Sequence, residues 1–210
     1  MTATGYRRPM AGRLGRMLGV GWCALAVLTL PARAQWRTLP KAHLDETRFF
    51  DGDSFTLVTA RSTRVYRLYF VDAPETDLEF PDRVKEQADY FGISVEAALR
   101  IGHAAKEFVR EFMRDGVTVY HRRQDAGGRT PRYFAIIRSG DGRYLCEALV
   151  EAGLARIHGL GTDLPDGTPE AKHWAKLRAA ERRARAAGVG AWGERSPRSR
   201  LFPRPPVEPP

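Results

Sequence analysis

The 210-residue chain contains only two cysteines, Cys23 and Cys146. Cys23 lies in an N-terminal segment that we expect to be cleaved, so Cys146 would be alone and no intramolecular disulfide could form. Cys146 lies within residues 144–150, an apolar pattern typical of a helix, which predicts a buried structural thiol and not a nucleophile. The mature chain must then be stabilised by packing, helped by any metal that it binds.

The chain also lacks the spacings that mark two common hydrolase classes. Its five histidines show no H-x-x-x-H or similar pairing, which argues against a zinc site. No G-x-S-x-G motif is present, which removes the usual indication of a serine hydrolase.

Long apolar runs are scarce as well, and the one near the N-terminus is short. Residues 17–30 form an apolar stretch of about fourteen residues, below the ~20 that a membrane-spanning helix needs. Arginines precede this stretch, and Pro31-Ala32-Arg33-Ala34 follows it with small residues at the A-x-A spacing. This order predicts a secretory signal peptide over residues 1–34, cleaved before Gln35; an uncleaved membrane anchor is the alternative. We therefore expect a secreted or periplasmic protein without stable membrane association after cleavage.

The charge balance changes when the signal peptide is set aside. The whole chain has a formal net charge of +9, but residues 1–34 hold five arginines and no acids, so +4 remains. The high pI therefore overstates the case for nucleic-acid binding, which the composition permits without requiring it. The basic run at residues 176–185 fits the solvated face of an amphipathic helix.

The order of expected elements predicts an α+β domain. Strand-like runs lie at residues 47–50, 54–60 and 63–71, followed by a helical region at 81–114 and by further strands at 117–121 and 132–138. Helices are expected at residues 145–152 and after Thr168, up to Gly188. We predict a five-stranded OB-fold (Greek-key) β-barrel with about three packed α-helices, although periodicity alone does not separate it from another α+β fold.

The domain organisation follows from these elements. We expect a signal peptide (1–34), an N-terminal lead-in (35–45), one folded domain (46–193) and a flexible tail rich in proline and arginine (194–210).

Two acidic clusters adjoin the second and third expected strands, and they predict a cation site. Asp53 and Asp72, with the backbone carbonyl of Ala73, offer the oxygen ligands that Ca²⁺ prefers. Asp51 could hold the waters of such an ion as a second shell. Glu75 follows Pro74, which stiffens the turn, and a carboxylate there can orient or deprotonate an attacking water.

Arginines complete a set of groups suited to phosphodiester cleavage. Arg67 alternates with core residues of its strand, so it can project from the same barrel face as the carboxylates. A guanidinium pairs with two phosphate oxygens and stabilises charge that builds up on phosphorus. A second arginine is expected from the later hairpin, where Arg132 and Arg129 compete for the role. Each piece alone is typical of a turn or a strand end; their joint order and spacing point to a nuclease.

The residues resemble the staphylococcal nuclease (thermonuclease) family over about residues 46–193. The most specific part is Val71-Asp72-Ala73-Pro74-Glu75-Thr76 with Arg67 upstream, and Gly190-Ala191-Trp192-Gly193 is similar to the family's closing motif. The resemblance implies an OB-fold barrel and Ca²⁺-dependent cleavage of DNA and RNA at the 5′ P–O bond. It further implies the site roles: metal ligands Asp53, Asp72 and the Ala73 carbonyl, general base or water-positioner Glu75, and phosphate clamps Arg67 and Arg132.

Departures from the family pattern limit what carries over. The segment 77–92 is longer than in the archetype, Thr130-Pro131 replaces a Tyr-Gly pair before Arg132, and residues 157–161 lack the tyrosines that flank a bound nucleotide. We expect a monomeric nuclease acting on DNA, RNA or both. The alternative is a non-catalytic OB-fold module that binds nucleic acid or protein, although every charged position of the motif is filled.

Overall fold

The computed structural model describes Met1, residues 35–128 and residues 130–194. The predicted signal peptide (1–34, apart from Met1), the predicted tail (194–210, apart from Glu194) and Arg129 lie outside the described residues. Within the described ranges, no helix is long and apolar enough to cross a membrane.

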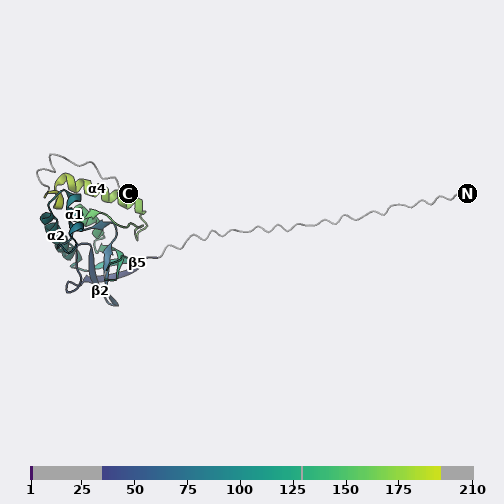
Figure 1. Ribbon diagram of the computed structural model, residues 1–210. Helices are drawn as coiled ribbons and strands as arrows, with labels where there is room; N and C mark the ends of the chain where they lie inside the picture. Colours follow the sequence, from purple (N-terminus) through teal and green to yellow (C-terminus); the bar gives the residue numbers. More distant parts are fainter. Residues whose placement is uncertain (2–34, 129, 195–210) are drawn as a thin grey trace. The chain divides into compact units, whose positions relative to one another are not determined.

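The domain is a mixed α+β structure in which five strands close into a barrel. The barrel order is β1-β2-β3-β6-β5, and β4 and β7 form a separate two-stranded ribbon. The elements are β1 (Arg37–Leu44), β2 (Ser54–Thr59), β3 (Ser62–Leu68), β4 (Val71–Asp72), α1 (Pro81–Phe91), α2 (Val95–Met113), β5 (Val117–Asp125), β6 (Arg132–Ser139), α3 (Leu145–Glu151), β7 (Arg156–Ile157), α4 (Glu170–Ala187) and a 3₁₀ turn at Gly190–Trp192. Figure 1 shows the labelled helices to one side of the strands. The α+β class and the five strands are confirmed.

Side-chain alternation in β3 sets which residues face the core. Tyr66 and Leu68 are buried, whereas Val65 and Arg67, which alternate with them, are only partly covered. Successive side chains of a strand point to opposite faces, so burial of Tyr66 and Leu68 turns Arg67 outward. β3 pairs antiparallel with β2 and parallel with β6, and this pairing brings the ends of three strands together beside Arg67.

The expectation of about three helices was wrong, because the described residues contain four α-helices. The region predicted as one helix over 81–114 is divided between α1 and α2. Gly92 ends α1 in the left-handed conformation, with φ of 71°, and the Ser94 side chain accepts a hydrogen bond from the Ala97 amide at 3.2 Å to start α2. The added helix, α1, packs beside the candidate site.

The expected first strand at 47–50 was also misplaced. The first barrel strand is β1, inside the predicted lead-in of residues 35–45, whereas residues 47–50 form a turn that ends in one bridge between Phe50 and Phe55. Pro40 and Lys41 interrupt β1: Lys41 has a φ of 54°, and the register with β5 shifts there. The irregularity hides the period of two on which the sequence argument relied.

Candidate active site

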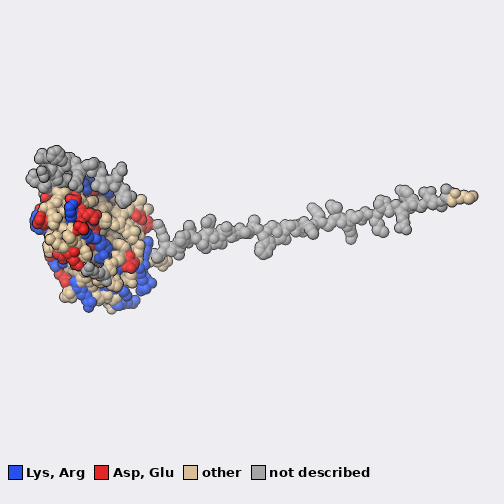
Figure 2. Space-filling model, in the orientation of Figure 1, with Lys and Arg blue, Asp and Glu red and all other residues tan. Residues whose placement is uncertain are grey.

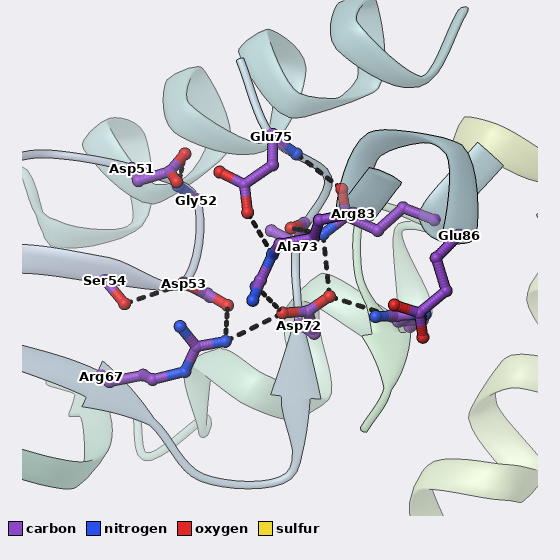
Figure 3. A network of polar contacts seen from close by, with 12 residues as sticks. Asp51, Gly52, Asp53, Ser54, Arg67, Asp72, Ala73, Glu75, Arg83 and Glu86 are labelled. Carbon is purple, nitrogen blue, oxygen red and sulfur yellow. Dashed lines mark hydrogen bonds and ion pairs between the residues drawn. The ribbon is translucent and has the colours of Figure 1, made fainter. Parts of the chain in front are cut away.

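Arg67 joins two buried carboxylates that come from different elements. Its Nη2 atom donates to Asp53 Oδ2 and to Asp72 Oδ1, each at 2.9 Å (Figure 3). Asp53 immediately precedes β2 and Asp72 ends β4; their exposed fractions are 3% and 0%. The structure therefore brings together three of the residues that the sequence singled out.

A left-handed residue makes this arrangement possible. Phe70, between β3 and β4, has a φ of 74°, which is uncommon for a bulky side chain. Its amide donates to the Leu160 carbonyl and its carbonyl accepts from the His158 amide, each at 2.9 Å. Its buried ring packs against Trp174 at 4.7 Å between ring centroids. The turn redirects the chain so that Asp72 returns to Arg67, five residues earlier.

Asp72 is the centre of a wider ion-pair network. Besides Arg67, it accepts from Arg156 Nε at 2.9 Å, from Gln87 Nε2 at 2.8 Å and from Arg83 Nη2. Burial alone would raise the pKa of Asp72, but the guanidiniums of Arg83 and Arg156 outweigh it and hold that pKa below its ordinary value. Asp72 therefore stays ionised in a dry environment.

Helix α1 supplies two of these partners, and neither was expected from the sequence. Arg83 and Gln87 are four residues apart, so they share one helix face. The fully buried Gln87 also donates to the Ala73 carbonyl at 3.0 Å and accepts from the Glu75 amide at 2.9 Å. Gln87 thus fixes the backbone from Asp72 to Glu75.

Glu75 is tied to the same network through Arg83, whose Nε atom pairs with Glu75 Oε1. The loop that carries Glu75 lies very close to α2. A Cβ atom added at Gly102 would lie 2.6 Å from the Pro74 carbonyl oxygen and closer still to that of Glu75. Only a glycine permits this approach, so Gly102 helps to set the position of Glu75.

Asp51 and Asp53 hold negative charge that their surroundings balance poorly. Burial raises the pKa of Asp51 to about 7, with the charges of Asp53 and Glu75 adding to the effect. Burial likewise raises the pKa of Asp53 to about 6, although Arg67 opposes the shift. An added positive charge at this place would favour both ionised carboxylates.

Arg132 approaches from β6. Its Nη1 atom donates to Ser54 Oγ at 3.2 Å and its Nε atom to the Gly127 carbonyl at 2.9 Å, and Ser54 Oγ donates in turn to Asp53 Oδ1 at 2.9 Å. Arg132 is therefore linked to the carboxylates through one hydroxyl. Its competitor, Arg129, lies outside the described residues.

The expected metal ligands are close together but differ in what they offer a cation. Both oxygens of Asp72 and the Ala73 carbonyl already accept hydrogen bonds from Arg67, Arg83, Arg156 and Gln87. Asp53 accepts one bond at each oxygen, and Asp51 accepts from the Gly52 amide at 2.7 Å. Among the described residues, no cluster of three or more His, Cys, Asp and Glu side chains has the geometry of a metal site.

The donor chemistry nevertheless suits a hard cation at Asp51 and Asp53. Carboxylate oxygens are the preferred ligands of Ca²⁺, and each oxygen keeps lone pairs beyond the bonds just described. Burial is the main cause of the raised pKa values of both carboxyls, and a bound cation would oppose that effect. A hard cation therefore fits well at Asp51 and Asp53 and less well at Asp72, where guanidiniums already neutralise the carboxylate charge.

Cys146 takes no part in this chemistry. It is free and 2% exposed, and burial raises its pKa to about 12. Its sulfur lies 3.6 Å from His173 Nε2 in the core. The prediction of a buried structural thiol is confirmed.

Three residues of the network could not be assigned from the sequence, and two of them carried only a faint indication. The spacing of four between Arg83 and Gln87 places both on one helix face, but such spacing is typical of any solvated face. Arg156 pairs with Asp72 in the register of β4 and β7, across a sequence separation that no local pattern reveals.

Comparison with known proteins agrees with the geometry. The family model described as "Staphylococcal nuclease homologue" matches residues 65–194, more than half of the 210-residue chain. No curated protein matches the sequence.

Proposed function

Since the chain belongs to the staphylococcal nuclease family, we propose that it is a calcium-dependent nuclease that hydrolyses phosphodiester bonds of DNA and RNA. The observation that carries the proposal is the contact of the Arg67 guanidinium with both Asp53 and Asp72, 2.9 Å from each. Carboxylates for a cation and a guanidinium for a phosphate lie within one small site, with Glu75 joined to it through Arg83.

The side chains divide the reaction between them. Arg67 and Arg132 bind oxygens of the scissile phosphate and stabilise the charge that develops as water attacks phosphorus. Glu75 accepts the proton of that water while the new P–O bond forms. The leaving oxygen departs with the electrons of the broken bond and takes a proton from solvent water, at the 5′ P–O position that the family resemblance implies.

The calcium proposal keeps the predicted ligands Asp53, Asp72 and the Ala73 carbonyl, with Asp51 behind them. Support comes from the donor chemistry and from the raised pKa values of Asp51 and Asp53. When bound, the cation would neutralise phosphate charge and make a water molecule more acidic. Because Asp72 already pairs with guanidiniums, Asp53 and Asp51 would carry most of the binding.

We also propose that the barrel is an OB-fold and that the enzyme acts as a monomer. The closed five-stranded barrel with a parallel β3–β6 pair supports the first point.

Digestion assays test the proposal. Purified protein is incubated with plasmid DNA and with RNA in Ca²⁺, Mg²⁺, Mn²⁺ or excess chelator. We expect cleavage in Ca²⁺ and none in chelator. Nucleic-acid binding without cleavage under every condition would instead identify a binding module.

Export is a separate proposal. The basic segment, the apolar run and the A-x-A spacing of residues 1–34 support a signal peptide. The mass of the protein recovered from the periplasm or medium should correspond to a chain beginning at Gln35. Recovery of the uncleaved chain in the membrane fraction would contradict export.

A further inference from the structure

A groove with a volume of about 440 Å³ lies on the barrel next to the candidate site. Residues before β2, on β3, and on or just before β6 line it, among them Arg48, Phe49, Arg64, Pro131 and Tyr133. Its volume falls within the range of pockets that hold small molecules, so one nucleotide unit is of suitable size. None of these five residues belongs to the network around Asp72.

The groove continues the phosphate-binding part of the site along the barrel surface. In the register of the strands, Ser54 pairs with Arg67 and Thr56 pairs with Val65. Thr56 and Val65 line the groove, and residues two apart in a strand point to the same face. Val65 also pairs with Arg132, the second expected clamp. A chain held at Arg67 and Arg132 therefore has its next unit beside the groove.

Phe49 is an exposed aromatic ring on a fixed backbone. The Thr56 amide and the Thr56 hydroxyl both donate to the Phe49 carbonyl, at 2.8 and 2.9 Å. The side chain nevertheless remains 45% exposed. A large apolar ring held in place at the surface of a groove is a suitable stacking platform for a base.

Positive charge accompanies this ring. Arg48, next to Phe49, is exposed at the groove. Arg64 alternates with Val65 and points to the opposite face of β3, where its guanidinium lies 5.8 Å from the centroid of the Tyr133 ring. Arg48 pairs with Asp45 at 3.2 Å, a surface contact that contributes little and is readily exchanged. In Figure 2, basic side chains gather at the bottom of the view, over the barrel strands. Charge and aromatic surface together fit a nucleic-acid backbone with its bases exposed.

We propose that this groove binds the unpaired nucleotide adjacent to the scissile phosphate of a single-stranded nucleic acid. Phe49 stacks on the base, while Arg48 contacts a flanking phosphate. The inference rests on the proposed nuclease function and deepens it: Phe49 and Arg48 give this chain a binding site for the base beside the scissile phosphate, and a base that is paired in a duplex is not free to stack there.

Binding and cleavage measured separately test the groove. A fluorescein-labelled single-stranded oligonucleotide is titrated in Ca²⁺ with Glu75→Gln protein, which prevents turnover, and anisotropy gives Kd. Adding Phe49→Ala should weaken binding about tenfold, and Phe49→Trp should restore it. Arg48→Ala should weaken binding and reduce its dependence on salt. The matched controls Phe80→Ala, with a ring of similar exposure (47%), and Arg182→Ala, at an exposed position of α4, should stay within twofold of the parent protein.

A small substrate separates the groove from the chemistry. With Glu75 intact, Phe49→Ala should cleave bis(p-nitrophenyl) phosphate at the wild-type rate, because this ester has no nucleotide to occupy the groove, and should lose kcat/KM on the oligonucleotide. The annealed duplex should respond less to Phe49→Ala than the single strand does.

The outcomes distinguish the two proposals. If the wild type cleaves nucleic acid while Phe49→Ala binds within twofold of its parent, the groove proposal is wrong and the nuclease proposal stands. If the wild type never cleaves nucleic acid but Phe49→Ala weakens oligonucleotide binding, the groove proposal is supported and the nuclease proposal is contradicted. A wild type that neither binds nor cleaves overturns both.

Discussion

Gln87 Nε2 lies 2.8 Å from Asp72 Oδ2 and donates a hydrogen bond to it, which joins helix α1 to the carboxylate at the centre of the site. The same amide group holds the Ala73 carbonyl and the Glu75 amide. One buried side chain thus fixes three consecutive parts of the loop that carries the expected metal ligands and base.

Replacing Gln87 should therefore affect both stability and activity. Gln87→Leu leaves the Glu75 amide and one Asp72 oxygen without this partner, which should cost about 1–3 kcal/mol of unfolding free energy and lower kcat more than it raises KM. Gln87→Glu keeps the shape of the side chain but puts a carboxylate beside Asp72, so it should lower the free energy of unfolding more than Gln87→Leu does. Urea unfolding and steady-state kinetics provide the measurements; equal stability of Gln87→Glu and wild type would contradict the prediction.

Arg156 should prove structurally more important than an exposed arginine with a similar ion pair. Its side chain is 5% exposed and bridges Asp72 and Glu86. Arg156→Met should lower the unfolding free energy by about 3 kcal/mol, because Asp72 loses one of its buried cations. Arg100→Met removes a pair with Glu194 at the surface and should cost less than about 1 kcal/mol. Comparable losses of unfolding free energy in the two variants would mean that the buried network stabilises the fold no more than a surface ion pair does.

Gly102→Ala should separate α2 from the loop of Glu75. The new methyl group would meet the Pro74 and Glu75 carbonyls, so we expect destabilisation of about 1–3 kcal/mol and a larger fall in kcat than stability alone explains. Gly140→Ala is the matched control, because an added Cβ there meets nothing within 4 Å. Wild-type activity in Gly102→Ala would refute a positioning role for this contact.

Asp51 should make stability depend on pH in the cation-free protein. The unfolded carboxyl ionises near 3.8, whereas burial holds the folded pKa at about 7. Between these values the folded state retains a proton that the unfolded state has released, so Asp51 lowers stability as pH rises. In excess chelator, the Tm of Asp51→Asn minus that of wild type should increase as the pH rises from 4.5 to 8. A Tm difference between Asp51→Asn and wild type that does not change with pH would count against the shifted pKa.

The sequence was sufficient for the parts of the site that lie in short, ordered motifs. The alternation of Arg67 with Tyr66 and Leu68 predicted an outward guanidinium, and the spacing of Asp53 and Asp72 placed both beside it. The structure brings these three residues together; their roles in binding a cation and a phosphate remain predictions.

The sequence was insufficient where position depends on tertiary packing. Arg83 and Gln87 have the appearance of an ordinary polar helix face until α1 packs over β4. Arg156 meets Asp72 only through the β4–β7 register, 84 residues away along the chain. Strand β1 escaped notice because Lys41 adopts a left-handed conformation that breaks its alternation.

The most direct test of the central claim is the rate of DNA cleavage by wild type, Glu75→Gln and Arg67→Ala in Ca²⁺ and in excess chelator. We predict cleavage by the wild type in Ca²⁺, its loss in chelator, and a fall of about 10²–10³-fold or more in kcat for each variant, with the folded state preserved by circular dichroism. Undiminished cleavage in chelator, or by both variants, would show that this cluster of carboxylates and guanidiniums is not the active site.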